Sequence, residues 1–175
     1  MTGVPQGGVG PVFPARLMKL ARLVLSDARD AGLMIATAES CTGGLVAACL
    51  TEIAGSSAAM DAGFVTYSDQ AKRTLLGVPG DLLADYGAVS EPVARAMAEG
   101  AIEHSRADIS VSITGIAGPG GGTAMKPVGL VHFASARRGA RIVHEAHNFG
   151  DVGRSEVRLR SLETALTMLL ARIAG

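Results

Sequence analysis

Apolar residues recur every three to four positions along several stretches of the chain, which is the spacing of an amphipathic helix. The first helix is predicted from Ala15, and Gly32 can end it because glycine tolerates the left-handed conformation at a helix C-terminus. A second starts at about Thr42, and a third occupies residues 69–77. A fourth has Ser90 as N-cap and Pro92 in its first turn, and extends to about residue 104. The last runs over residues 153–173.

Short apolar runs between these helices have the length and pattern of strands. They cover residues 33–38, 62–67 and 108–114, and the last of these alternates Ile109, Val111 and Ile113 with polar residues. Residues 128–136 and 140–149 flank a short turn at Arg138–Gly139, which predicts a β-hairpin. The alternation of helices and strands predicts an α/β fold, a three-layer α/β/α sandwich with a mixed, mostly parallel sheet. We expect one domain over residues 15–175, preceded by a flexible Gly- and Pro-rich tail at 1–14.

The amino-acid composition indicates which binding partners and which cellular compartment are expected for this protein. The 175 residues are 48% hydrophobic, and 16 Lys and Arg balance 16 Asp and Glu. This balance, together with the absence of Trp, argues against nucleic acid as the main partner. The start of the chain lacks the pattern of a signal peptide, and no apolar run approaches a membrane span. Cys41 and Cys49 are too far apart on one helix to form a disulfide, which favours a reducing, cytoplasmic location.

The stretch ATAESCTGGLVAACL, residues 36–50, crowds reactive side chains at a strand-to-helix turn. Ser40 lies just before the predicted helix, with Gly43 and Gly44 in its first turn. Free backbone amides at such a helix start, over residues 42–44, can stabilise the oxyanion that forms when a serine attacks a carbonyl. A serine nucleophile needs a base, and no histidine occupies a comparable turn.

Lys72 occupies a comparable position at the start of the next helix, shortly after Tyr67. A helix N-terminus and burial both disfavour the charged form of lysine, so both lower its pKa toward that of a general base. Each of these residues also has an ordinary structural interpretation when it is considered alone. Ser40 is then an N-cap, Tyr67 is a half-buried strand residue, and Lys72 is a surface residue of a helix. A competing chemistry uses Cys41 as the nucleophile with Glu39 and Lys72, as in nitrilase-like amidases. We interpret Cys41 as a packing residue.

Three other features are weaker candidates. The glycine-rich loop over residues 115–122 follows a strand, where α/β proteins bind ligands, but it lacks the phosphate-loop spacing. His144 and His147 alternate along a strand and therefore point to opposite faces, which argues against a metal pair. Arg154 and Arg158 share a helix face and could hold an anionic group.

Five segments of the chain resemble the CinA C-terminal domain family. They are TAESCTGGLVAACLTEIAGSS (37–57), GFVTYSDQAKRTLLGV (63–78), GAVSEPVARAMAEGA (87–101), ADISVSITGIAGPGGG (107–122) and KPVGLVHFA (126–134). Stand-alone members of this family are nicotinamide-nucleotide amidases of the PncC type. Two departures are Asp69, where the family commonly has Asn, and GDVGR (150–154), where it has a GDR triplet.

The resemblance implies hydrolysis of nicotinamide mononucleotide to nicotinic acid mononucleotide and ammonia, without a metal or cofactor. It implies a Ser–Lys mechanism that uses Ser40, Tyr67 and Lys72. The substrate-binding residues expected with them are Thr42, Gly43, Gly44, Thr114, Gly115, Gly118, Gly121, Gly122 and Arg158. It also implies a homodimer or higher homo-oligomer, and the balanced charge and the lack of a long apolar run predict that nucleic acid and membranes are not partners. The alternative is a non-catalytic nucleotide-binding or regulatory module.

Overall fold

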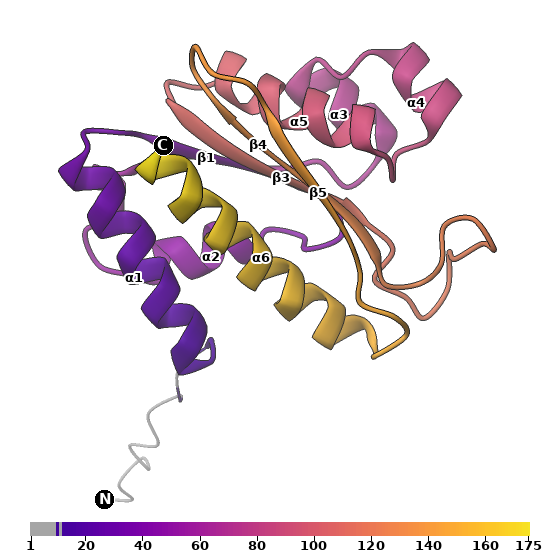
Figure 1. The fold of residues 1–175 in the computed structure, drawn as a ribbon, viewed down its shortest axis with the longest axis horizontal. Helices are drawn as coiled ribbons and strands as arrows, with labels where there is room; N and C mark the ends of the chain where they lie inside the picture. Colours follow the sequence, from indigo (N-terminus) through magenta and orange to yellow (C-terminus); the bar gives the residue numbers. More distant parts are fainter. Residues whose placement is uncertain (1–9, 11) are drawn as a thin grey trace, which may run out of the picture.

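The computed structural model describes residue 10 and residues 12–175 of the chain. Figure 1 shows the helices and strands in their order along the sequence. They are α1 (Ala15–Asp30), β1 (Ile35–Glu39), α2 (Leu45–Thr51), the 3₁₀ helix η1 (Ser56–Ala58), β2 (Met60–Val65), α3 (Asp69–Leu76), α4 (Gly80–Tyr86), α5 (Glu91–Glu103), β3 (Ile109–Gly115), β4 (Leu130–Arg137), β5 (Val143–Asn148) and α6 (Arg154–Ala174).

The five strands form one mixed sheet with the order β2-β1-β3-β4-β5. Strand β1 pairs in parallel with both β2 and β3, whereas β4 is antiparallel to β3 and to β5. Helices α1, α2 and α6 lie on one face of the sheet, and α3, α4 and α5 lie on the other (Figure 1). The predicted three-layer α/β/α fold, its mixed sheet and its late hairpin are therefore confirmed.

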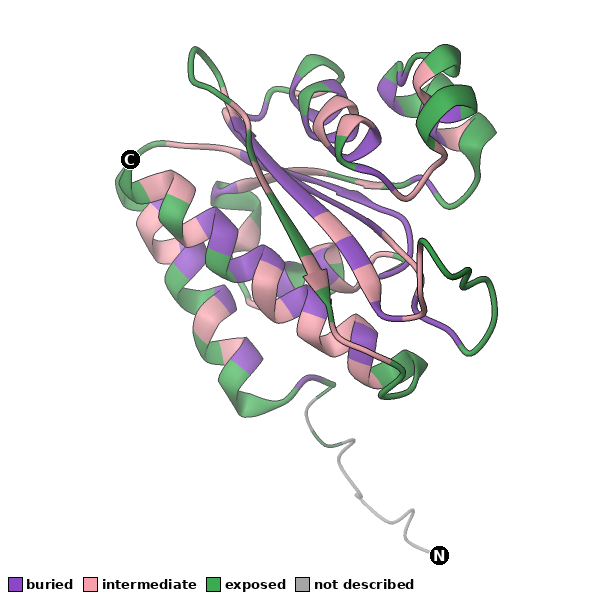
Figure 2. Cartoon of the chain, turned by 45° about the vertical axis from the view of Figure 1, so that its right-hand side comes forward, coloured by how far each residue is buried: buried purple, intermediate pink, exposed green. Residues whose placement is uncertain are grey.

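The central strands are buried on both faces, as Figure 2 shows. On β3, Ile109, Val111 and Ile113 belong to the core that includes α1 and α6. The intervening Ser110 and Ser112 face α5, and their hydroxyls donate to the carbonyls of Ala98 (2.6 Å) and Ala94 (2.6 Å). These short side chains allow the helix backbone to approach the sheet while their buried hydroxyls remain paired.

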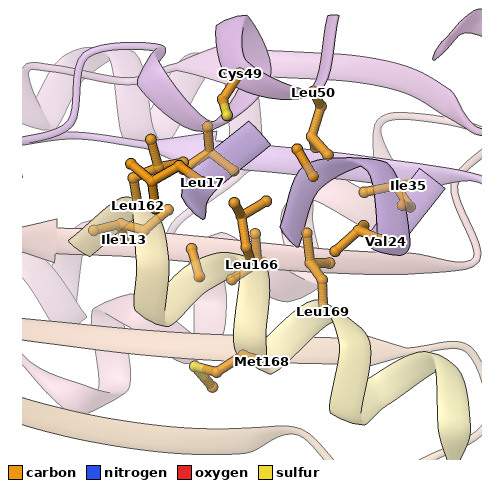
Figure 3. Packing of buried hydrophobic residues seen from close by; sticks show 14 of the residues in the cluster. Leu17, Val24, Ile35, Cys49, Leu50, Ile113, Leu162, Leu166, Met168 and Leu169 are labelled. Atoms are coloured by element: carbon orange, nitrogen blue, oxygen red, sulfur yellow. The ribbon is translucent and has the colours of Figure 1, made fainter. Parts of the chain in front are cut away.

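The larger core fills the space between the sheet and the layer of α1, α2 and α6. Figure 3 shows leucines of α6 packed against apolar side chains of α1 and α2. Its fully buried members include Leu17, Val24, Ile35, Cys49, Leu50, Ile113, Leu162, Leu166 and Leu169. Its members from α1, α2 and α6 recur at helical spacing in the sequence, so the helical part of the core follows the amphipathic pattern, while Ile35 and Ile113 come from β1 and β3.

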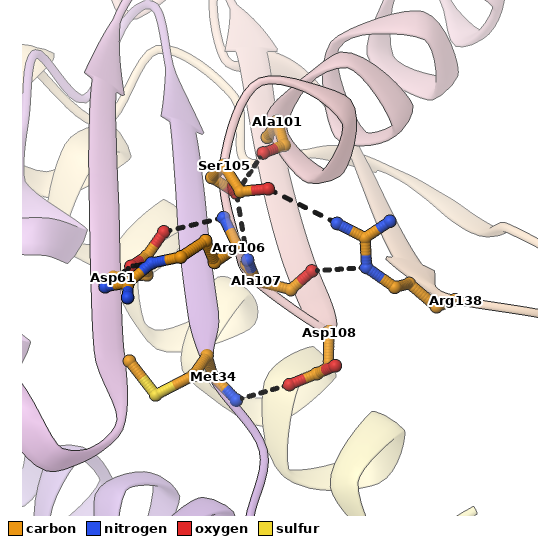
Figure 4. Close-up of polar contacts among 8 residues, drawn as sticks. All are labelled: Met34, Asp61, Ala101, Ser105, Arg106, Ala107, Asp108 and Arg138. Carbon is orange, nitrogen blue, oxygen red and sulfur yellow. Dashed lines mark hydrogen bonds and ion pairs between the residues drawn. The ribbon is translucent and has the colours of Figure 1, made fainter.

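Polar contacts tie together the end of the sheet where β1, β2 and β3 begin (Figure 4). The Asp108 carboxylate accepts a hydrogen bond from the Met34 amide (2.9 Å). Asp61 accepts one from the Arg106 amide (2.8 Å), which lowers the pKa of the Asp61 carboxyl, and it also pairs with the Arg106 guanidinium. Arg138 donates to the Ala107 carbonyl (3.0 Å). These contacts hold the strands in place at their amino-terminal ends. The residues at the opposite, carboxyl ends are therefore not needed for this anchoring.

Three details differ from the sequence prediction. Helix α2 begins at Leu45 rather than at about Thr42, because Gly43 and Gly44 have φ of +61° and +94° and cannot continue a right-handed helix. Helix α4 was not predicted. Phe13, at the end of the predicted tail, is buried in the core, whereas residues 1–9 and 11 of that tail lie outside the described residues.

In the described part of the chain, no helix is both long and apolar enough to cross a membrane.

Candidate active site

Ser40 lies in a tight turn directly after β1. The Ser40 amide donates to the Ile113 carbonyl of β3 (2.9 Å), and the Ser40 carbonyl accepts from the Gly43 amide (2.9 Å). The turn is therefore anchored to the neighbouring strand and closed on itself. With 9% of its surface exposed, Ser40 is held at the boundary between the core and an open cavity.

The buried carboxylate of Glu39 occupies the start of α2. It accepts hydrogen bonds from the amides of Gly44 (3.0 Å), Val46 (3.1 Å) and Ala47 (2.9 Å), and from the Thr37 hydroxyl. The expectation that the Gly43 and Gly44 amides are free for an oxyanion is therefore wrong, because the protein itself uses both. A carboxylate at this position also satisfies the positive end of the helix dipole.

Lys72 extends from the first turn of α3 to the Ser40 turn. Its Nζ is 3.3 Å from Ser40 Oγ and 3.0 Å from the Thr66 carbonyl oxygen, and only 1% of the residue is exposed. Among the described residues, no carboxylate forms an ion pair with Lys72. Burial lowers the pKa of the Lys72 ammonium, while Asp69 acts in the opposite direction. An uncharged amine that faces a hydroxyl is the arrangement that a general base requires.

Tyr67 and Arg154 form a polar contact at the rim of this cavity. The Tyr67 hydroxyl accepts a hydrogen bond from Arg154 Nη2 (2.9 Å), and Arg154 Nη1 donates to the Gly118 carbonyl (3.0 Å). The guanidinium thus connects the segment after β2 to the glycine-rich loop after β3. Tyr67 is 60% exposed, so its ring remains accessible to a ligand in the cavity.

A cavity of about 280 Å³ joins these residues at the carboxyl ends of the parallel strands. The predicted residues that line it are Ser40, Tyr67, Lys72, Thr114, Gly115, Gly118 and Gly121. Cys41, Asp69, Ala88, Val89 and Arg154 are also part of the lining. The position agrees with the general rule that α/β sheets bind ligands where their parallel strands end.

The end of β3 is shaped by two of these residues. A Cβ at Gly115 would approach Val131 Cγ2 to 2.7 Å, so only glycine allows β4 to pack this closely here. The Thr114 hydroxyl donates to the Ala88 carbonyl (2.7 Å) and thereby holds the segment before α5 against the cavity. Thr114 lines the cavity, but its hydroxyl is already engaged within the protein.

Five predicted binding residues do not line the cavity, namely Thr42, Gly43, Gly44, Gly122 and Arg158. Arg158 lies behind the turn, and its Nη2 donates to the Thr42 carbonyl (2.9 Å). The arginine that lines the cavity is Arg154, which lies one helical turn earlier. Sequence reasoning identified the shared face of these two arginines, but only the fold shows which of them faces the cavity.

The thiol of Cys41 is a poor nucleophile in this environment. Burial is the main cause that raises its pKa to about 12, so the thiol stays protonated at neutral pH. Its side chain also belongs to the apolar core, as the packing interpretation predicts. Cys41 and Cys49 are both free thiols, in agreement with the expected absence of a disulfide between them.

His144 and His147 point to opposite faces of β5, as their spacing predicts. The ring of His144 stacks on His132 of β4, and the ring of His147 stacks on Phe149. Across the described residues, no group of three or more His, Cys, Asp or Glu side chains has the arrangement of a metal site.

Comparisons with known proteins agree with this architecture. The family model for the CinA C-terminal domain matches residues 17–173. The nicotinamide-nucleotide amidohydrolase PncC of Escherichia coli (strain K12) is 49% identical over 156 residues, which cover 89% of this chain and 93% of that protein. The crystal structure of the competence/damage inducible protein CihA from Agrobacterium tumefaciens superposes with a TM-score of 0.92 at 53% identity. That match covers 94% of this chain and 99% of the other.

Longer relatives match over part of their length. A CinA-like protein of Mycobacterium sp. (strain JLS) is 58% identical over 140 residues, or 79% of this chain and 33% of that protein. The chain thus spans about a third of the length of such relatives.

Proposed function

The chain belongs to the CinA C-terminal domain family, and we propose that it is an amidohydrolase that converts nicotinamide mononucleotide to nicotinic acid mononucleotide and ammonia. The name of the E. coli relative, which matches nearly end to end, supports this class of reaction. The observation that carries the proposal is the distance of 3.3 Å between Lys72 Nζ and Ser40 Oγ, with the amine buried and, in the part of the chain that the structure describes, without an ion-pair partner.

In the proposed first step, the uncharged amine of Lys72 takes the proton of the Ser40 hydroxyl. Oγ then attacks the carboxamide carbon and forms a tetrahedral intermediate. The resulting Lys72 ammonium gives its proton to the amide nitrogen. The C–N bond breaks, ammonia leaves, and an ester joins the acyl group to Ser40.

In the second step, water hydrolyses this ester with Lys72 again acting as the base. The carboxylic acid leaves, and the proton returns to Ser40 Oγ. Lys72 thus serves as acid and base in turn, which requires a pKa below the usual lysine value.

Tyr67 and Arg154 are the polar groups proposed to orient the substrate. Because the Tyr67 hydroxyl accepts its hydrogen bond from Arg154, it keeps its own proton to donate to the carbonyl oxygen or the departing nitrogen. The Arg154 guanidinium, at the rim of the cavity, suits the phosphate of a mononucleotide. Arg158 instead acts as a positioning residue, through the Thr42 carbonyl.

The test is the release of ammonia from nicotinamide mononucleotide by the purified wild-type protein and by two single variants. We expect Ser40→Ala to lower kcat by at least about 10³, the loss typical when a group that acts in the transition state is removed. Cys41→Ala, which changes the adjacent residue, should keep most of the activity. An inactive Cys41→Ala beside an active Ser40→Ala would assign the nucleophile to cysteine. Nucleotide binding by wild type without ammonia release would favour the regulatory module.

Two further expectations stay predictions. The family resemblance implies a homo-oligomer, and the unpaired cysteines favour a cytoplasmic location. Sedimentation velocity of the purified protein tests the first, and fractionation of the source cell tests the second.

A further inference from the structure

A second cavity, of about 330 Å³, lies between α1 and the connection from α2 to β2. It is formed near Ala59, whose carbonyl accepts from the Ile35 amide at the start of β1. Ser40 follows the opposite end of the same strand. The two cavities share no lining residue and are separated by the length of β1, which is roughly 17 Å for five residues.

The floor of this second cavity is apolar and its rim is cationic. Leu25 and Ala59 are buried beneath it. Arg22, Ser26 and Arg29 line it from α1, where spacings of four and seven residues place them on one helix face. Ser56 adds a hydroxyl from the facing 3₁₀ helix η1. Two guanidiniums and two hydroxyls therefore surround a small apolar floor.

These two arginines have no carboxylate in direct contact within the described chain. Neither Arg22 nor Arg29 forms an ion pair there, whereas Arg16 on the same helix pairs with Glu163. Asp27 and Asp30 lie on either side of Arg29 in the sequence, and Glu52 precedes Ile53, but none of these three acidic residues lines the cavity. The lining of the cavity therefore contains two arginines and no acidic residue.

We propose that this cavity binds a small organic phosphate. Guanidiniums recognise phosphate through paired, charge-assisted hydrogen bonds, and hydroxyls of serine complete such sites. A volume of about 330 Å³ lies at the lower end of the range of ligand pockets, so it suits a phosphorylated metabolite of about mononucleotide size. The apolar floor would receive the organic part while the phosphate meets the arginines. This site is independent of the proposed amidase reaction.

Titration with inorganic phosphate, followed by amide NMR of the full chain, tests the proposal. The amides of Gly55 and Ser56 report on this cavity, and those of Gly118 and Gly121 report on the active-site cavity. We expect saturable shifts at Gly55 and Ser56. The double variant Arg22→Ala/Arg29→Ala should weaken that binding at least about tenfold, since it removes two charged donors. The signals of Gly118 and Gly121 should respond as in wild type.

Two variants serve as controls. Lys19→Ala removes one positive charge from an exposed position of the same helix that does not line the cavity, so it should leave the affinity unchanged. Ala58→Glu keeps both arginines but places a carboxylate at the exposed edge of the cavity, so it should abolish phosphate binding there. The proposal is overturned if Gly55 and Ser56 show no saturable shift. It is also overturned if the double variant binds as wild type does, or if Lys19→Ala weakens binding as much as the double variant.

Discussion

Lys72 is the residue at which stability and function conflict. A buried lysine without a carboxylate partner destabilises the fold whenever it carries its charge. In exchange, its amine is uncharged closer to neutral pH and faces a hydroxyl at hydrogen-bonding distance. Such a position makes sense for a base that must release and recover a proton in each turnover.

Replacing Lys72 separates the two roles. We expect Lys72→Met to lower kcat by about 10²–10⁴, because it removes the proposed base, while the free energy of unfolding stays equal or rises. Lys72→Arg should be equally inactive, since a guanidinium does not deprotonate. Ammonia release and urea unfolding are the measurements. A Lys72→Met variant that keeps wild-type turnover would exclude the lysine from the reaction.

Ser40 and Lys72 could be predicted as site residues from their positions at strand-to-helix turns, but Arg154 could not be separated from Arg158. Both arginines lie on one face of the last helix. Which of them reaches the cavity depends on how α6 sits against the Ser40 turn, where Arg158 meets the Thr42 carbonyl and Arg154 meets Tyr67. That choice rests on packing between distant segments, which helical spacing does not encode.

At the scale of elements, α2 shows how one buried carboxylate orders a short helix. The helix has seven residues and no N-cap side chain, so its first amides depend on Glu39. The sequence predicted the helix from its apolar positions but placed its start too early. The apolar pattern does not indicate that the Glu39 carboxylate accepts the Gly44 amide. It also does not indicate that Gly43 and Gly44 adopt left-handed conformations, which delay the start of the helix.

Removal of the Glu39 carboxylate should therefore loosen both α2 and the Ser40 turn. We expect Glu39→Ala to lower the free energy of unfolding by about 2–4 kcal/mol, because it leaves several buried amides without an acceptor. Glu39→Gln, which keeps one oxygen as acceptor, should lose less. Urea denaturation measures both, with Glu52→Ala at an exposed position of the same region as the control. Equal stability of Glu39→Ala and Glu52→Ala would contradict the capping role.

At the scale of the whole molecule, the strand order explains why distant segments meet. Strand β1 lies between β2 and β3, so the carboxyl ends of three parallel strands deliver Ser40, the α3 segment and the glycine-rich loop to one edge. The α/β pattern predicted this convergence in general terms. The hydrogen bond between Arg154 and Tyr67 forms only because the start of α6 lies at the same edge of the sheet. The position of α6 depends on the complete topology, which the local sequence pattern does not predict.

The same sheet contains a histidine pair that makes stability depend on pH. His132 Nδ1 is 3.1 Å from His144 Nε2, and burial lowers the pKa of both rings. Glu91, Arg95, Lys126 and Glu145 are the other charged groups that influence them. A histidine with a lowered pKa binds fewer protons in the folded state than in the unfolded state. Its contribution is therefore lost as pH falls below about 6.5.

We expect the free energy of unfolding to fall from pH 7.5 to pH 5.5 in the wild-type protein. The double variant His132→Gln/His144→Gln should flatten that dependence, because glutamine does not titrate. Urea unfolding at a series of pH values is the measurement. If the free energy of unfolding depends on pH equally in the wild-type protein and in the double variant, groups other than these two histidines cause the loss of stability at low pH.

The central claim, that a buried uncharged amine activates Ser40, is tested most directly by titrating Lys72 itself. The chain has only three lysines, Lys19, Lys72 and Lys126, so ¹³Cε labelling of lysine gives few signals, and the one missing in Lys72→Arg belongs to Lys72. We predict that this signal titrates below the usual lysine value of about 10.4, and that kcat/KM for nicotinamide mononucleotide rises with pH through the same midpoint. A Lys72 signal that titrates at or above that value, or a rate that does not follow it, would contradict the account.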